Sequence, residues 1–214
     1  GKHFPGRGEC AEDAHRSSPI IDMPKQDFLD IHVAPYKTLI EAGLPSVMTA
    51  HTIYPMLDKK RMPASLSKAI TTELLKEELG FKGCVLTDEI TMGGIVAEYD
   101  VPEACILALE AGADQILFRD EGGVIDEAFP AMVEAVKSGR ISEARLDDAV
   151  ERTLSMKYDY GFFEEGHNVR DPKKASEGAR DPKVHQISVE GAIDTMQVLR
   201  DEENLLPVSK DTKV

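Results

Sequence analysis

Basic residues are in deficit in this chain of 214 residues. Lysine and arginine number 25 against 39 aspartates and glutamates, which gives a formal net charge of −14 at pH 7. Binding to a nucleic-acid backbone or to an anionic membrane requires a stripe of basic side chains, and the sequence contains none. We therefore expect partners other than nucleic acid and membranes.

Cysteine is equally scarce. The three cysteines, Cys10, Cys84 and Cys105, lack the spacing of metal ligands, and Cys84 and Cys105 lie in apolar runs. Free buried thiols favour a reducing compartment, so a cytoplasmic location is predicted. Long apolar runs are missing too, because none reaches the length of a membrane-spanning helix.

A regular alternation of short strands and helices is present from about residue 36 onward. Apolar runs predict strands at residues 46–50, 83–87 and 115–118. Apolar residues at helical spacing, with glycines as stop signals, predict helices at residues 36–42, 67–79, 104–111, 124–138 and 142–158. Continuous apolar strands that alternate with helices are typical of a parallel sheet covered by helices, so the predicted fold class is α/β.

Polar side chains follow the predicted strands. His51 and Asp88 each come directly after a strand, and the pair Lys2-His3 is expected to end a strand whose body lies upstream. Three or four strand–helix units fit half of an eight-stranded barrel or a small doubly wound sheet. The polar residues after the strands do not distinguish these two architectures. In a barrel the carboxyl ends of the strands converge on one face, where catalytic groups lie, so these side chains would share a pocket.

The character of the sequence changes after Tyr160. Residues 164–182 are charged and contain two prolines and two glycines, which is typical of a linker. The periodicity of residues 186–200 predicts another amphipathic helix, and residues 204–208 begin an element that the chain does not complete. The predicted organisation is a first domain at residues 1–163, a linker at 164–183 and the start of a second α/β domain at 184–214.

Four motifs resemble, in order and spacing, those of the family 3 glycoside hydrolases: KHFPGRG at residues 2–8, EDAH at 12–15, VMTAH at 47–51 and GFKGCVLTDEITMGGI at 80–95. The similarity is greatest to the β-N-acetylhexosaminidase branch, whose members carry a Lys-His-Phe-Pro-Gly loop followed by Asp-x-His. MQVLRDEENLLPV at residues 196–208 is similar to the start of the α/β sandwich domain of two-domain members. The sequence departs from the common pattern at Arg7, where many members have histidine, and at Glu89, where many have a second aspartate.

The resemblance implies a (β/α)8 TIM-barrel catalytic domain, of which the chain holds only the second half, followed by the linker and the first helix of the sandwich domain. The family's barrel has strands ahead of the opening loop, so the missing N-terminal half of the barrel is an expected partner. An isolated half-barrel would leave open sheet edges, and we expect it to associate or aggregate and to be inactive alone. A native N-terminus upstream of Gly1 leaves secretion open as an alternative to the cytoplasm.

The resemblance also implies three catalytic residues. Asp88 matches the nucleophile that a retaining glycosidase needs below the anomeric carbon. Glu89 is its neighbour, but successive side chains of a strand point to opposite sides, so both cannot attack. His15 matches an unusual proton donor, because an imidazole with an unperturbed pKa of about 6.5 gives up and recovers a proton near neutrality. Asp13 is expected to hold the other ring nitrogen of His15, as the aspartate of a serine-protease triad does.

Five further residues are implied as substrate contacts. Lys2 and His3 match residues that grip sugar hydroxyls and so orient the substrate. His51 is a candidate polar contact and Met92 a candidate apolar wall, although packing alone also accounts for both. Arg7 either contacts the substrate or braces the loop that carries it.

The function implied by the resemblance is removal of a terminal β-linked N-acetylglucosamine from saccharides such as chitin or peptidoglycan fragments, through a glycosyl-enzyme on Asp88. No cofactor and no metal are expected in this mechanism. Phosphorolysis, in which phosphate replaces water in the second step, is an alternative that uses the same residues. Two readings of another class stay open: a metal-dependent hydrolase with His3, His15, His51 and Asp88 as ligands, and an inactive structural fragment.

Overall fold

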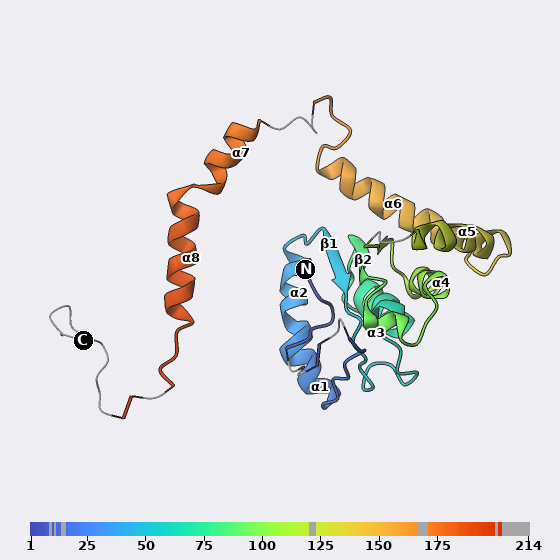
Figure 1. The fold of residues 1–214 in the computed structure, drawn as a ribbon, viewed down its shortest axis with the longest axis horizontal. Helices are drawn as coiled ribbons and strands as arrows, with labels where there is room; N and C mark the ends of the chain where they lie inside the picture. Colours follow the sequence, from blue (N-terminus) through green and yellow to red (C-terminus); the bar gives the residue numbers. More distant parts are fainter. Residues whose placement is uncertain are drawn as a thin grey trace. The chain divides into compact units, whose positions relative to one another are not determined.

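The computed structural model describes residues 1–8, 10, 12–13, 16–119, 123–166, 171–199 and 201–202. The chain divides into two compact units, Gly1–Phe163 and Glu164–Val214. The sheet and most of the helices belong to the first unit, and α7 and α8 belong to the second (Figure 1). No helix in the described ranges is long and apolar enough to cross a membrane.

The sheet of the first unit consists of three parallel strands in the order β1 (Ser46–Thr49), β2 (Cys84–Glu89) and β3 (Gln115–Leu117). The opening segment extends it beside β1, because the Phe4 N–H donates to the Met48 carbonyl (2.8 Å) and the Ala50 N–H donates to the Phe4 carbonyl (2.8 Å). The strands follow one another in chain order, without the reversal that defines a doubly wound sheet. The predicted parallel α/β architecture is confirmed, and the half-barrel stays a prediction.

Helices precede, separate and follow the strands (Figure 1). Before β1 lie α1 (Lys25–Phe28), the π-helix η1 (Leu29–Val33) and α2 (Ala34–Glu41). Between the strands lie the 3₁₀-helix η2 (Ala64–Leu66), the π-helix η3 (Ala69–Glu78), α3 (Gly93–Val96) and α4 (Val101–Ala111). After β3 come α5 (Val124–Lys137), α6 (Glu143–Asp159), α7 (Pro172–Ala179) and α8 (Pro182–Asp194).

Local signals set the ends of the helices in the first unit. Gly112 ends α4 in the left-handed conformation, with a φ of 114° that glycine adopts without steric conflict. Ser142 caps α6, because its hydroxyl oxygen accepts a hydrogen bond from the Arg145 N–H (3.2 Å). The predicted helices at 104–111 and 142–158 therefore agree with the structure.

The helices of the second unit differ from the prediction. The helix predicted at 186–200 is replaced by α8, which begins and ends earlier, and α7 lies within the segment 164–183 predicted as a linker. Both helices begin at an Asp-Pro pair, and the carboxylates of Asp171 and Asp181 each accept from the backbone N–H two residues on. Aspartate at the N-cap with proline at the first helical position is a start signal for a helix. Prolines that indicate a linker by composition start helices here because of the residue before each.

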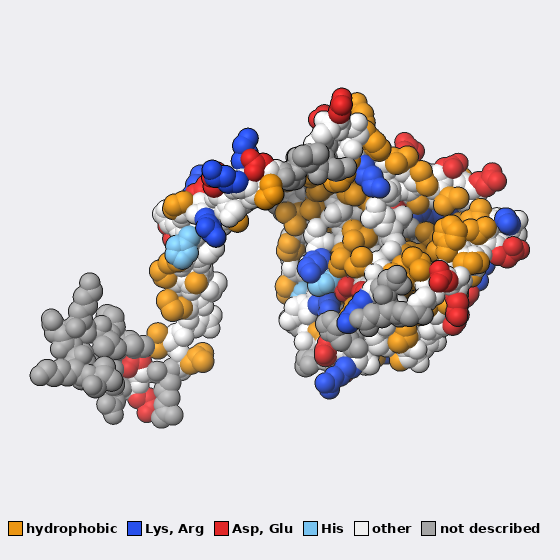
Figure 2. Space-filling view, turned by 45° about the horizontal axis from the view of Figure 1, so that its top comes forward, with side chains coloured by type: hydrophobic (Ala, Val, Ile, Leu, Met, Phe, Trp, Pro, Cys, Tyr) orange, Lys and Arg blue, Asp and Glu red, His pale blue; other side chains and the backbone are white. Residues whose placement is uncertain are grey.

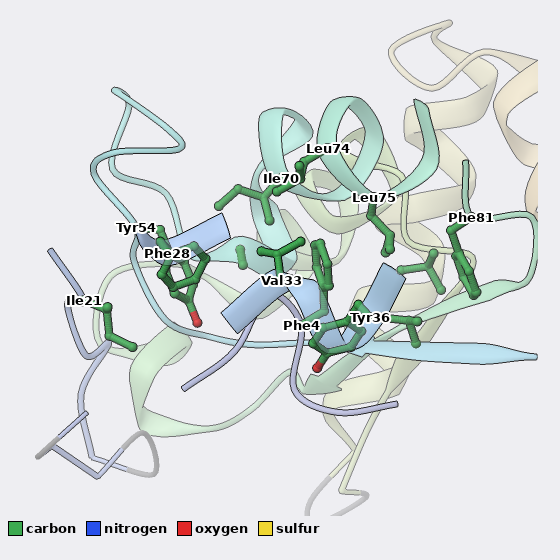
Figure 3. Packing of buried hydrophobic residues seen from close by; sticks show 13 residues of the cluster. Phe4, Ile21, Phe28, Val33, Tyr36, Tyr54, Ile70, Leu74, Leu75 and Phe81 are labelled. Atoms are coloured by element: carbon green, nitrogen blue, oxygen red, sulfur yellow. The ribbon is translucent and has the colours of Figure 1, made fainter. Parts of the chain in front are cut away.

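Aromatic side chains form the centre of the larger core (Figure 3). The rings of Phe4 and Tyr36 meet edge to face with their centroids 5.0 Å apart, and those of Phe28 and Tyr54 lie 5.2 Å apart. Ile70 of η3 is fully buried in the same cluster. This core joins the opening segment, the helices before β1, and η3, and it thereby fixes the segment that carries Lys2 and His3.

Cys84 and Cys105 are buried free thiols, as their apolar surroundings predict. Burial raises the pKa of Cys105 to about 12, with a smaller contribution from Asp100, so this thiol is protonated at neutral pH. Cys105 packs with Ala104 and Ala108 in a second core of mainly small side chains. Small side chains let α4 lie close to the neighbouring elements.

A buried ion network lies at the amino end of β3. The Asp114 carboxylate accepts hydrogen bonds from the Lys76 ammonium (2.8 Å), the Arg145 guanidinium (2.7 Å) and the Val85 N–H (2.8 Å). Its side chain is 0% exposed. Burial lowers the pKa of Lys76, and the Asp114 carboxylate opposes this shift. The network joins η3, β2 and α6 to one carboxylate.

We expect Asp114→Ala to destabilise the first unit by about 3–5 kcal/mol, because it leaves Lys76 buried without its closest anionic partner. Urea unfolding followed by circular dichroism measures the change in free energy. The matched control is Arg140→Ala, since Arg140 pairs with Glu103 and Glu110 on the surface, and exposed pairs contribute less than about 1 kcal/mol. Equal effects of the two substitutions would show that the buried network is not a principal stabilising contact.

Candidate active site

Polar side chains from neighbouring strands meet at the carboxyl end of the sheet. His3 comes from the opening segment, His51 follows β1, and Asp88 and Glu89 end β2. The His3 Nε2 lies 3.5 Å from the Asp88 Oδ2, and these side chains are 26% and 14% exposed. His3 and Asp88 are far apart in the sequence, with 84 residues between them. The parallel sheet brings them together at the carboxyl ends of its strands.

Asp88 and Glu89 have different surroundings although they are adjacent. The Asp88 Oδ1 accepts a hydrogen bond from the Glu89 N–H (2.9 Å), and its Oδ2 faces His3. The Glu89 Oε1 accepts from the N–H groups of Thr91 (2.8 Å) and Arg119 (3.1 Å), so this carboxylate holds the loops that follow β2 and β3. The arrangement leaves Asp88 as the carboxylate at this end of β2 that is available to a substrate.

His51 is almost completely buried, with 1% of its surface exposed. Its Nδ1 lies 2.7 Å from the Ser65 hydroxyl, and its Nε2 lies 2.8 Å from the Glu89 carbonyl oxygen, to which it donates. Burial lowers the pKa of His51, and the bond to Glu89 opposes the shift. Both ring nitrogens have protein partners, so the geometry favours the packing role of His51 over contact with a substrate.

The loop that begins at Gly6 is held by hydrogen bonds at both of its described ends. At its start, the Tyr54 hydroxyl donates to the Gly6 carbonyl (2.8 Å), and Gly6 has a φ of 128°. A Cβ atom at Gly6 would lie 2.9 Å from the His32 Cβ, so glycine is required for this close approach. At its end, the Ser18 hydroxyl donates to the Gly94 carbonyl of α3.

Of the two predicted catalytic residues in this loop, the structure describes Asp13 but not His15. Asp13 is exposed, and its carbonyl accepts a hydrogen bond from the Arg16 N–H (3.0 Å). His15 lies outside the described residues. Met92, the predicted apolar wall, is 8% exposed and directly precedes α3. Met92 lies two residues before Gly94, the acceptor of the Ser18 hydrogen bond, and this position agrees with either packing or lining a pocket.

Two anchors of this loop were not among the predicted site residues. The Tyr54 hydroxyl donates to the Gly6 carbonyl, and His32 lies close to Gly6 and Gly8; both residues are outside the recognised motifs. The signal in the sequence is the pair Gly6 and Gly8, because glycines in a polar loop indicate either positive φ or a close neighbour. The sequence does not show which neighbour this is.

The charges of two basic side chains, Lys2 and Arg7, act on His3. Burial lowers the pKa of His3, the Asp88 carboxylate opposes this shift, and the charges of Lys2 and Arg7 add to it. Lys2 is exposed and Arg7 is half-buried. The neutral form of the His3 imidazole is therefore favoured, with its Nε2 3.5 Å from the Asp88 Oδ2. Among the described residues, no three histidine, cysteine, aspartate or glutamate side chains lie close enough to hold a metal ion.

The model of the glycosyl hydrolase family 3 N-terminal domain matches residues 1–156. The chain belongs to glycosyl hydrolase family 3. It is 29% identical, over 98% of its length and 38% of the relative's, to a beta-N-acetylglucosaminidase/beta-glucosidase of Cellulomonas fimi. The structure of a family 3 beta-N-acetylglucosaminidase from Paenibacillus sp. matches 73% of the chain and 30% of that protein, with 39% identity and a TM-score of 0.72.

A beta-glucoside phosphorylase, BglX, is a third match. Its structure covers 97% of the chain and 39% of BglX, with 30% identity and a TM-score of 0.84. The chain therefore spans between 30% and 39% of the length of these three proteins. The family resemblance stated from the motifs is confirmed, and the roles of individual residues stay predictions.

We expect Asp88→Asn to lower the pKa of His3, because the carboxylate stabilises the imidazolium form and the amide does not. A ¹H–¹⁵N NMR titration of the histidine ring measures this directly. Asp100→Asn is the control, since Asp100 is an exposed carboxylate that is not among the groups that shift His3. An unchanged or higher His3 pKa in Asp88→Asn would contradict the 3.5 Å contact in solution.

Proposed function

We propose that this chain contributes the catalytic residues of a retaining glycosidase that removes a terminal β-linked N-acetylglucosamine. The observation that carries the proposal is the Asp88 carboxylate, which lies beside His3 at the carboxyl end of a parallel sheet in a family 3 chain. Two of the matched proteins are named as beta-N-acetylglucosaminidases, which supports this substrate class. Chitin and peptidoglycan fragments both present such a terminal sugar.

Asp88 acts as the nucleophile in this proposal. Its carboxylate attacks the anomeric carbon, the bond to the leaving oxygen breaks, and a glycosyl ester forms on Asp88. The surroundings of the carboxylate support this role. Glu89 is engaged with the loops after β2 and β3, whereas Asp88 keeps one oxygen toward the neutral His3 ring.

His15 acts as the proton donor to the leaving oxygen and then takes a proton from the water that cleaves the ester. An imidazole has an unperturbed pKa of about 6.5, which suits both steps near neutral pH. Asp13 stabilises the imidazolium from the second ring nitrogen. The hydrogen bonds of Gly6 and Ser18, which flank this pair in the sequence, hold the two described ends of its loop.

Lys2 and His3 orient the sugar through its hydroxyls, and Met92 contributes an apolar wall. Donors held in place convert binding energy into orientation of the anomeric carbon toward Asp88. The core around Phe4 and Tyr36 supports this role, since it fixes the opening segment directly after Lys2 and His3.

Transfer of the sugar to phosphate is the second candidate function, and the match to a beta-glucoside phosphorylase favours it. A histidine that serves as acid and base carries no negative charge, so it repels an incoming phosphate less than a glutamate would. Both candidate functions share the glycosyl ester on Asp88 and differ only in the acceptor that cleaves it.

We expect Asp88→Asn to reduce turnover of an aryl N-acetyl-β-glucosaminide by ~10⁴-fold, because an amide does not form the glycosyl ester. The assay uses the complete natural protein, with circular dichroism to show that the fold is kept. Asp100→Asn, an exposed carboxylate that follows α3, should retain normal turnover. Near-normal activity of Asp88→Asn would overturn the assignment, and a fluorinated slow substrate trapped on the peptide that contains Asp88 would support it.

His15→Ala should slow substrates with poor leaving groups by about 10²–10⁴-fold, and substrates with activated aryl leaving groups far less, because only the former need a proton at departure. Asp13→Ala should give a smaller loss with the same dependence on the leaving group. Steady-state rates across a series of leaving groups measure this dependence. A loss that is equal for all leaving groups would exclude His15 as the acid.

A further inference from the structure

The regular pairing of β2 with its neighbours ends at the proposed nucleophile. In the pairing of β1 with β2, Thr49 and Thr87 are the last partners, and Asp88 is the next residue. The register of β2 with β3 shifts between Leu86 and Glu89, so β2 has one residue more than β3 over this stretch. An extra residue bends a strand and re-aims its side chains, and such irregularities are common next to active sites. Contacts other than the strand ladder must therefore set the position of Asp88.

Side-chain hydrogen bonds hold this end of β2 on both sides. On the side of β1, the His51 Nε2 donates to the Glu89 carbonyl oxygen (2.8 Å). On the side of β3, the Glu89 Oε1 accepts from the N–H of Arg119 (3.1 Å), a residue that follows β3. The same oxygen accepts from the N–H (2.8 Å) and from the hydroxyl of Thr91. Glu89 therefore joins the end of β2 to the segments that follow β1 and β3.

The backbone of Glu89 transmits this constraint to Asp88. The Glu89 N–H donates to the Asp88 Oδ1 (2.9 Å), so the residue that is held on both sides also orients the neighbouring carboxylate. The Asp88 Oδ2 then lies 3.5 Å from the His3 Nε2. A nucleophile needs this kind of orientation, because a misplacement of about 1 Å costs about 100-fold in rate. A single oxygen of Glu89 meets the donors of Thr91 and Arg119, so the arrangement depends on the reach of this side chain.

We propose that Glu89 is a positioning residue that orients the Asp88 carboxylate through the hydrogen bond that its own carboxylate accepts from Arg119. This inference rests on the proposed nucleophilic role of Asp88. Aspartate, which many family members have at position 89, readily accepts from the N–H two residues on, which here belongs to Thr91. Its side chain is one methylene shorter. In this chain the longer glutamate keeps the local bond to Thr91 and also reaches Arg119.

Two substitutions in the complete natural protein separate the reach of Glu89 from its charge. Glu89→Gln removes the charge and keeps an acceptor oxygen at the same reach, whereas Glu89→Asp keeps the charge and loses the bond to Arg119. With an aryl N-acetyl-β-glucosaminide, Glu89→Gln should retain kcat within about fivefold, since its neutral acceptor is weaker but correctly placed. Glu89→Asp should lower kcat by about 10–100-fold with little change in KM, because Asp88 is displaced while the contacts with the sugar stay in place.

Figure 2 shows aspartate and glutamate side chains at separate places on the visible face of the first unit. Glu98, an exposed glutamate that follows α3, provides the matched control. Glu98→Gln and Glu98→Asp make the same chemical changes and should leave kcat and KM unchanged. The opposite order, with Glu89→Gln impaired and Glu89→Asp active, would overturn the proposal, because charge and not reach would then matter. Equal kcat values of the two Glu89 variants, whether normal or low, would overturn it too.

The pKa of His3 tests the position of Asp88 without any turnover. The Asp88 carboxylate raises this pKa, and Glu89 is not among the groups that shift it, so a change in a Glu89 variant indicates that Asp88 has moved. An NMR titration should show a lower His3 pKa in Glu89→Asp, and a pKa near the natural value in Glu89→Gln. This difference without sugar release by the natural protein would support the positioning role and contradict only the proposed function. An equal His3 pKa in the two variants would overturn the positioning role of Glu89.

Discussion

The Asp114 carboxylate is the contact on which the placement of β2 depends. Its Oδ2 accepts from the Val85 N–H, and its own N–H donates to the Val85 carbonyl (2.7 Å), so Val85 is held at both backbone groups. Asp88 lies three residues farther along the same short strand. Lys76 and Arg145 compensate the buried negative charge from η3 and α6. Fixing the amino end of β2 therefore fixes the direction and position of Asp88 at its carboxyl end.

Three carboxylates of this region differ in their hydrogen-bond and ion-pair partners, and therefore in the roles that they can have. Asp114 is buried and paired with cations, and one oxygen of Glu89 accepts hydrogen bonds from backbone N–H groups of two loops. Asp88 has one backbone partner and one neutral imidazole as a neighbour. A carboxylate that already has strong cationic partners is a poor nucleophile, because an attack would break those contacts. Asp88 is the least committed of the three.

Local signals in the sequence predict the first unit well and the second unit less well. Glycine after an apolar run, as at Gly112, ends a helix because its backbone adopts positive φ, and this depends on no distant residue. The Asp-Pro pairs at the starts of α7 and α8 are equally local, but their composition is also that of a linker. The hydrogen-bond partners of His51 follow from no local signal, because Ser65 and Glu89 are distant in the sequence and only the fold brings them to His51. Motifs place His51 at the site, and only its hydrogen bonds show that both ring nitrogens are engaged.

The protonation state of His3 links the fold to the chemistry of Asp88. Burial favours the neutral ring, and the charges of Lys2 and Arg7 favour it further, although Asp88 favours the imidazolium. A charged His3 would form an ion pair with Asp88 and, in the proposed mechanism, would weaken the attack of this carboxylate on the anomeric carbon. A neutral His3 beside Asp88 leaves the negative charge of the carboxylate uncompensated. Lys2 and Arg7 thus act indirectly on Asp88, the proposed nucleophile, because their charges favour the uncharged form of His3.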